Sequence, residues 1–185
     1  VNCLLYVPSR VEESCELLLE IPQDYEVATG LNKVSKHQYA GKNFHELVDC
    51  PLIASNTLQH HSYHQNGVEF HLWFQGECKP NWKQLETDFK KFSKAQIEAF
   101  GDFPTKTYHF LFQILTHKAY HGVEHTNSTV ILLGPSYDIM NKEGWYEELL
   151  GVSSHELYHT WNVKQIRPIE MHPYDYSPEN YTELG

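Results

Sequence analysis

Short apolar segments separated by breaking residues fill the first part of the chain. The segments 3–7, 15–21 and 24–28 are largely apolar, and each ends at a proline or at a Thr-Gly pair. Their lengths and boundaries are typical of short strands in a β-sandwich. We therefore expect the N-terminal part of the chain to form a β-domain.

The clearest local prediction is a β-hairpin at Asn66-Gly67. An Asn-Gly pair favours a tight turn with positive φ angles. After it, Val68, Phe70, Leu72 and Phe74 alternate with Glu69, His71, Trp73 and Gln75, which is the pattern of a half-buried strand. Just before it, His60, His61 and His64 are expected to lie at the surface, because a strand does not bring positions i and i+4 together as a chelating pair.

Helical periodicity replaces this alternation after residue 78. Apolar residues recur at three- and four-residue intervals over 82–100, and Gly101 is expected to end that helix. Strands are expected at 107–115 and 128–133. A second helical region begins at Trp145, with an expected break at Gly151, and a final helix is expected near Glu179.

This order of elements predicts an α+β chain with two domains. We expect an N-terminal β-sandwich-like domain over 1–78 and part of a second domain over 79–185. The formal net charge is −10, which argues against nucleic acid or an anionic membrane as the main partner. No apolar run approaches the roughly 20 residues that cross a bilayer, and residues 1–20 lack the basic start of a signal peptide.

The four cysteines leave the compartment open. No two of them are close enough in sequence for a CxxC metal site or redox pair. One or two disulfides would fit an exported protein, and free, half-buried thiols would fit equally well. Both an exported and a cytoplasmic location therefore agree with the sequence, which also leaves the oligomeric state unassigned.

The candidate chemistry lies in one five-residue motif, His155-Glu156-Leu157-Tyr158-His159. On a helix, residues i and i+4 share one face, so both imidazoles can bind one Zn²⁺. Glu156 lies one step around the helix and can take a proton from a metal-bound water as the general base. Chance alone gives about 0.09 HExxH matches per chain of this length and composition, so the sequence around the motif must support the assignment.

A zinc site needs a third protein ligand. The extended motif of one large protease class would place Gly at 162 and His at 165, but the chain has Asn162 and Gln165. The other main solution is a Glu on a following helix, and spacing alone favours Glu179. A solvated surface carboxylate is the ordinary alternative for Glu179.

Several blocks of this chain together resemble the PDZ-containing glycyl aminopeptidase family of gluzincin metallopeptidases. The resemblance extends over roughly residues 44–185, and its two central blocks are long enough to be specific. The blocks are 44–53, 120–129, 155–164, 166–168 and 173–176.

The resemblance implies an N-terminal β-domain followed by the first half of a thermolysin-like catalytic domain. It implies Zn²⁺ as the cofactor, peptides as substrates, and release of N-terminal residues, of which some members favour Gly and Ala. It also implies a third ligand in a Glu-Gly context beyond Gly185, which leaves Glu179 as the fallback and makes the activity of residues 1–185 alone doubtful. Family members in complete form carry a C-terminal PDZ domain.

Substrate binding is assigned around the strand that precedes the zinc motif. The resemblance places Glu124 near the substrate, where a fixed carboxylate can bind the α-ammonium group of a peptide. Gly122 is expected to let the substrate backbone approach closely, and His125 is a weaker candidate for substrate contact.

Two alternatives remain at this stage. In one, the chain is a catalytically silent scaffold that binds a peptide or a partner protein, and the HExxH motif is vestigial. In the other, the protein is a zinc endopeptidase, in which Glu124 has no role in recognising a free amino terminus.

Overall fold

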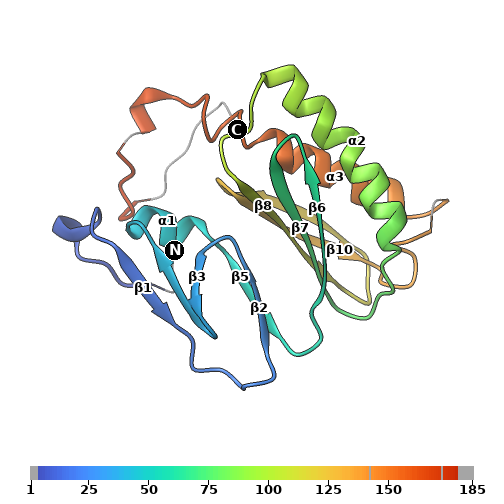
Figure 1. The fold of residues 1–185 in the computed structure, drawn as a ribbon, viewed down its shortest axis with the longest axis horizontal. Helices are drawn as coiled ribbons and strands as arrows, with labels where there is room; N and C mark the ends of the chain where they lie inside the picture. The colour runs from blue at the N-terminus through green and yellow to red at the C-terminus, as the bar shows by residue number, and fades with distance from the viewer. Residues whose placement is uncertain (1–3, 142, 172, 179–185) are drawn as a thin grey trace.

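A computed structural model describes residues 4–141, 143–171 and 173–178, and its strands form three separate sheets. The first lobe holds a three-stranded antiparallel sheet in the order β1-β4-β3 and a two-stranded antiparallel sheet of β2 and β5. A short helix, α1, caps this lobe (Figure 1). Its elements are η1 (Pro8–Arg10), β1 (Cys15–Leu18), β2 (Glu26–Thr29), β3 (Asn32–Ser35), β4 (Gln38–Gly41), α1 (Phe44–Asp49) and β5 (Leu52–Ser55).

The second lobe is built on a five-stranded sheet in the order β6-β7-β8-β10-β9. The central pairs β7–β8 and β8–β10 are parallel, whereas the outer pairs β6–β7 and β9–β10 are antiparallel. Strand β9 therefore lies at one edge of the sheet. The strands are β6 (Gln59–Gln65), β7 (Val68–Gln75), β8 (Thr107–Ile114), β9 (Ala119–Glu124) and β10 (Ser128–Gly134).

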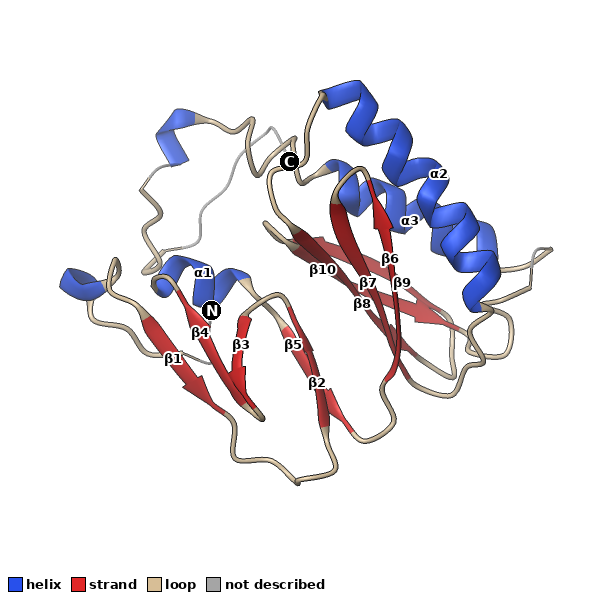
Figure 2. Cartoon of the chain, viewed as in Figure 1, coloured by secondary structure: helices blue, strands red, loops and turns tan. Residues whose placement is uncertain are grey.

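Two long helices, α2 (Trp82–Phe100) and α3 (Tyr146–Tyr158), cover one face of this sheet (Figure 2). The described chain continues from α3 through a loop to η2 (Ile169–Met171). The alternating residues of β7 point toward the helices and are fully buried there with Phe89 of α2. The main core therefore lies between the sheet and the two helices, and it fixes the position of α3.

Several local predictions are confirmed. The mixed α+β class is correct, and the hairpin turns at Asn66 and Gly67 with φ angles of 51° and 79°. Helix α2 occupies the predicted 82–100 and ends at Gly101, whose φ is 93°. These predictions are correct because each depends on a pattern or a breaking residue within a few positions along the chain.

Three predictions need correction. The division at residue 78 does not separate the sheets, because β6 and β7 pair into the sheet of the second lobe and the sheets divide between β5 and β6. Helix α3 runs through Gly151 without a break, since packing outweighs the cost of about 1 kcal/mol for glycine in a helix. Residues 4–7 form no strand; Tyr6 there stacks on Phe44 of α1. The helix expected near Glu179 lies outside the described residues.

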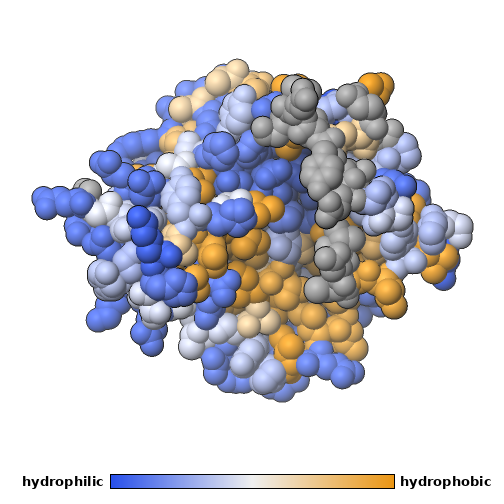
Figure 3. Space-filling model, turned by 180° about the vertical axis from the view of Figure 1, so that it is seen from behind, coloured by the Kyte–Doolittle hydropathy of each residue, from blue (hydrophilic) through white to orange (hydrophobic). Residues whose placement is uncertain are grey.

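None of the helices among the described residues combines the length and apolar character needed to cross a bilayer. Hydrophilic side chains cover much of the face seen in Figure 3, while apolar side chains gather in its lower central part. Cys15, Cys50 and Cys78 are free thiols.

A row of aromatic and imidazole rings crosses the sheet face opposite the helices. His71 of β7 stacks on His109 of β8 with ring centroids 4.4 Å apart, and His60 Nε2 lies 3.0 Å from His71 Nδ1. Trp73 Nε1 donates to His109 Nδ1 over 3.2 Å, so His109 is held with that nitrogen unprotonated. Burial, and then the neighbouring His71 and His60 rings, lower the pKa of His109 to about 3.

This row predicts a specific loss of stability in mild acid. The folded pKa of His109 lies below its unfolded value of about 6.5, so the unfolded chain binds more protons between these values. The contribution of neutral His109 to the free energy of unfolding should be fully present above about pH 6.5 and should decrease as the pH falls. The free energy of unfolding in urea should decrease between pH 7 and pH 5. In His109→Gln this decrease should be smaller than in the wild type by on the order of 1 kcal/mol. The exposed His64→Gln serves as the control; an equal loss in wild type and His109→Gln would contradict this assignment.

Candidate metal centre

The last turn of α3 positions the candidate site. His155 and Glu156 lie on α3, and His159 is its C-cap residue. The buried face of α3, which includes Leu149 and Leu157, packs into the main core. This packing leaves His155 exposed, while Glu156 is only 5% exposed.

The two imidazoles of the motif converge. His155 Nε2 lies 3.0 Å from His159 Nε2, and the rings meet edge to face with centroids 4.6 Å apart. His159 Nδ1 lies 2.8 Å from the carbonyl oxygen of Asn162. A carbonyl can only accept, so we assign the proton to Nδ1, which leaves the Nε2 lone pair of His159 for a metal.

Glu156 carries a buried carboxylate beside these imidazoles. Its Oε2 atom is buried and has no hydrogen-bond partner among the described residues. Burial raises the pKa of Glu156; His159 and His155 oppose this effect, and Glu124 adds to it. An orphaned buried oxygen next to two converging imidazoles fits a cation site, because a cation and its water would satisfy these groups.

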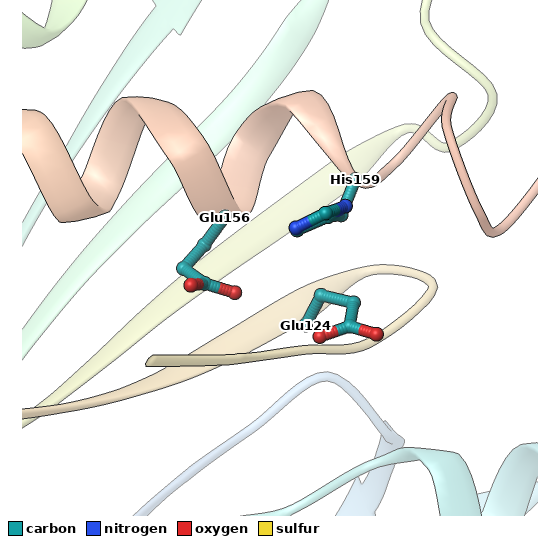
Figure 4. A group of neighbouring side chains, drawn as sticks. All are labelled: Glu124, Glu156 and His159. Carbon is teal, nitrogen blue, oxygen red and sulfur yellow. The ribbon is translucent and has the colours of Figure 1, made fainter. Parts of the chain in front are cut away.

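Glu124 reaches the same place from the edge strand. It is the last residue of β9, in register with Thr129 of β10. Glu124, Glu156 and His159 each offer a ligand atom, and these atoms lie within 4.8 Å of one another. Figure 4 shows Glu156 and His159 extending from the end of α3 toward Glu124. The site is therefore formed between the helix and the edge strand.

Gly122 makes this close approach possible. A Cβ atom built on Gly122 would lie 2.2 Å from Glu156 Oε1 and 2.5 Å from its carboxyl carbon. Any other residue at this position would force the carboxylate or the strand to move. Gly122 therefore gives the Glu156 side chain its space, and its expected role toward the substrate backbone stays a prediction.

The structure brings five of the predicted site residues together and separates the others. Glu124, Glu156 and His159 form one cluster, His155 contacts His159, and Gly122 lies against Glu156. His125 turns away, and its Nδ1 lies 3.6 Å from Oδ1 of Asp49 on α1. Glu179 lies outside the described residues, and the third ligand expected beyond Gly185 stays a prediction.

Sequence reasoning missed one residue at the border of the site. Asp49 ends α1 in the first lobe, far from the motif along the chain, yet it forms an ion pair with Lys164 just after the motif. An isolated acidic residue at a helix end has no distinguishing pattern.

Two family models match this chain. A family model described as the M61 glycyl aminopeptidase matches residues 148–185, and the model of the Peptidase M61 N-terminal domain matches residues 1–56. Together they match just over half of the chain. A search of the curated proteins finds no match.

Solved structures extend the likeness to nearly the whole chain. The crystal structure of an aminopeptidase N family protein from Idiomarina loihiensis is 26% identical, with a TM-score of 0.89 over 98% of this chain and 32% of that one. An M1 zinc metallopeptidase from Deinococcus radiodurans is 14% identical, with a TM-score of 0.51 over 77% of this chain and 32% of that one. At that identity the second likeness shows the fold alone. This chain spans about a third of the length of either structure.

The matched family models define the class as a peptidase family. More narrowly, the chain belongs to the M61 glycyl aminopeptidase family. The family match includes both the first lobe and the end of α3 with its motif.

The contact between Gly122 and Glu156 generates a prediction about stability. Gly122→Ala should lower the free energy of unfolding in urea by about 1–3 kcal/mol, because its methyl group overlaps a buried side chain. Glu156→Ala removes the overlapping atoms, so the double variant should be more stable than the sum of the two single changes implies. Gly151→Ala is the control, since a Cβ at Gly151 meets nothing within 4 Å. Additive effects at 122 and 156 would contradict the proposed overlap.

Proposed function

We propose that this chain provides the motif helix and the edge strand of a zinc-dependent aminopeptidase that releases small N-terminal residues such as Gly and Ala. The observation that carries the proposal is the convergence of His155 and His159 beside the buried Glu156, with Glu124 opposite them. Membership in the M61 family supports the reaction class. The preference for small residues rests on the family resemblance.

The residues that would hold zinc are His155 and His159, with a third protein ligand expected beyond Gly185. Two Nε2 atoms 3.0 Å apart suit a single ion that binds each nitrogen at about 2.0–2.1 Å. When bound, zinc polarises a peptide carbonyl and lowers the pKa of a water molecule to about 7, which supplies a nucleophile at neutral pH. Asn162 keeps the His159 ring oriented through its backbone carbonyl.

Glu156 is the proposed general base. Its Oε2 atom is free to accept a proton and later to donate it to the departing amine. Burial raises its pKa, which moves a carboxylate toward the pH at which proton transfer in both directions is efficient. Because Gly122 has no side chain, strand β9 leaves room for the Glu156 carboxylate.

Glu124 is the proposed anchor for the substrate's amino terminus. A peptide with a free α-ammonium group carries a positive charge about one residue from the bond to be cut. A carboxylate at the end of β9, within 4.8 Å of the Glu156 and His159 ligand atoms, can bind that charge through strong hydrogen bonds. This arrangement favours removal of one residue at a time over internal cleavage.

The first test replaces the proposed base. In a protein that carries residues 1–185 together with any sequence that follows them, Glu156→Gln should retain zinc but lower kcat by about 10²–10⁴-fold, because the amide cannot accept the proton. Zinc content is measured by atomic absorption and kcat with glycyl and alanyl peptides. Glu147→Gln, an exposed residue in the first turn of α3, is the control. Unchanged kcat would exclude Glu156 as the base, and a wild-type protein without zinc would favour the silent scaffold.

The second test addresses the substrate's amino terminus. Glu124→Gln should raise KM for peptides with a free amino group by at least about tenfold, since a charge-assisted hydrogen bond is lost. The rate with N-acetylated peptides should stay low and unchanged. If wild type cleaves acetylated and free peptides equally well, the endopeptidase alternative holds. If Glu124→Gln loses zinc, Glu124 is a metal ligand and not the anchor.

A further inference from the structure

Asp49, the last residue of α1, contacts two separate segments of the second lobe. Its Oδ2 atom accepts a hydrogen bond from the backbone N–H of Thr126 over 2.7 Å. Its Oδ1 atom accepts one from Lys164 Nζ over 2.9 Å and lies 3.6 Å from His125 Nδ1. One carboxylate of the first lobe therefore joins the turn after β9 to the loop after α3.

Both segments carry residues of the metal centre. His125 and Thr126 directly follow Glu124. On the other side, the backbone N–H of Lys164 donates to the carbonyl oxygen of His159 over 3.1 Å. A shift of Asp49 would thus be transmitted to the proposed substrate anchor and to one metal-binding residue at the same time.

The electrostatics of Asp49 make this contact a strong one. Burial raises the pKa of Asp49, but the neighbouring His125, the hydrogen bonds from Thr126 and Lys164 and the charge of Lys164 outweigh that effect, so its pKa lies below the ordinary range. The side chains of Asp49 and Lys164 are only 26% and 15% exposed. Partial burial strengthens such a pair relative to one in open solvent.

The turn after β9 has a second attachment to the first lobe. Asn127 Nδ2 donates to the carbonyl oxygen of Gly30 over 2.9 Å, and Cys50 Sγ lies 3.5 Å from Asn127 Oδ1. A Cβ atom at Gly30 would lie 2.3 Å from Asn127 Oδ1, so the two lobes approach closely here. These contacts fix the turn against the residue that neighbours Asp49.

We propose that Asp49 is a positioning residue of the metal centre, which holds Glu124 and His159 at their working separation through Thr126 and Lys164. The first lobe is then part of the catalytic apparatus, although it supplies no ligand. This inference rests on the proposed aminopeptidase function, and it extends that function to a residue outside the motif.

Asp49→Asn tests the proposal, because the amide oxygen can still accept from Thr126 while the charge that holds Lys164 is lost. The ratio of kcat/KM for a free peptide to that for its N-acetylated form should fall about tenfold. The dissociation constant for zinc, measured by competition with a chelator, should rise by about 10–100-fold, as for other residues that orient ligands. A variant that only unfolds more easily would lower both kcat/KM values equally and leave their ratio unchanged.

Asp24→Asn is the matched control. Asp24 is in the same lobe, and its Oδ2 atom accepts a hydrogen bond from Asn56 Nδ2 over 3.1 Å, but it belongs to no contact with the second lobe among those described. Asp24→Asn should change neither the ratio of kcat/KM for free and N-acetylated peptides nor the affinity for zinc. If Asp24→Asn has the same effect as Asp49→Asn, the effect is a general consequence of altering the first lobe, and the proposal is overturned.

A double-mutant cycle with Lys164→Met tests whether Asp49 acts on zinc binding through Lys164. Asp49→Asn and Lys164→Met should each weaken zinc binding, and the double variant should be no weaker than the worse single one. Additive losses, or an Asp49→Asn protein with wild-type ratio and zinc affinity, would overturn the proposal. If wild type binds zinc but cleaves no peptide, the proposed function fails alone, and the zinc measurements still decide the role of Asp49.

Discussion

The close contact of α3 with the edge strand β9 is the constraint on which the rest of the site depends. The helix lies so near the strand that the Glu156 carboxylate occupies the space where a side chain at position 122 would begin. This contact places Glu156 in a buried position and brings His159 and Glu124 within reach of the same point. A helix further from the strand would leave the imidazoles and the two carboxylates as separate surface groups.

A buried carboxylate with an unsatisfied oxygen is costly for a fold by itself. The cost is reduced by the two neighbouring imidazoles, which oppose the rise in the pKa of Glu156. The proposed ligands are also oriented from outside the site. Asn162 fixes the His159 ring through its backbone carbonyl, and the proposed role of Asp49 extends this orientation to the first lobe. Such an arrangement is expected where a cation and a proton-transfer group must work together.

The parts of the structure that could be predicted from the sequence are local. The turn at Asn66-Gly67, the helix ended by Gly101 and the convergence of the His155 and His159 rings each follow from residues one to four positions apart. The sheet to which β6 and β7 belong depends on parallel pairing with β8, across a whole intervening helix. Asp49 contacts Lys164 only where the two lobes pack together. No sequence pattern near either residue predicts this ion pair. The predicted helix break at Gly151 was wrong because packing of α3 into the core compensates for a residue that forms helices poorly.

The coordination of bound zinc tests the central claim most directly. X-ray absorption spectroscopy of the zinc-loaded protein reports the number and distance of imidazole ligands. We expect two histidine nitrogens at about 2.0–2.1 Å from the zinc, and one when either His155 or His159 is replaced. A spectrum with fewer than two imidazoles, or one that is unchanged in both single variants, would contradict it.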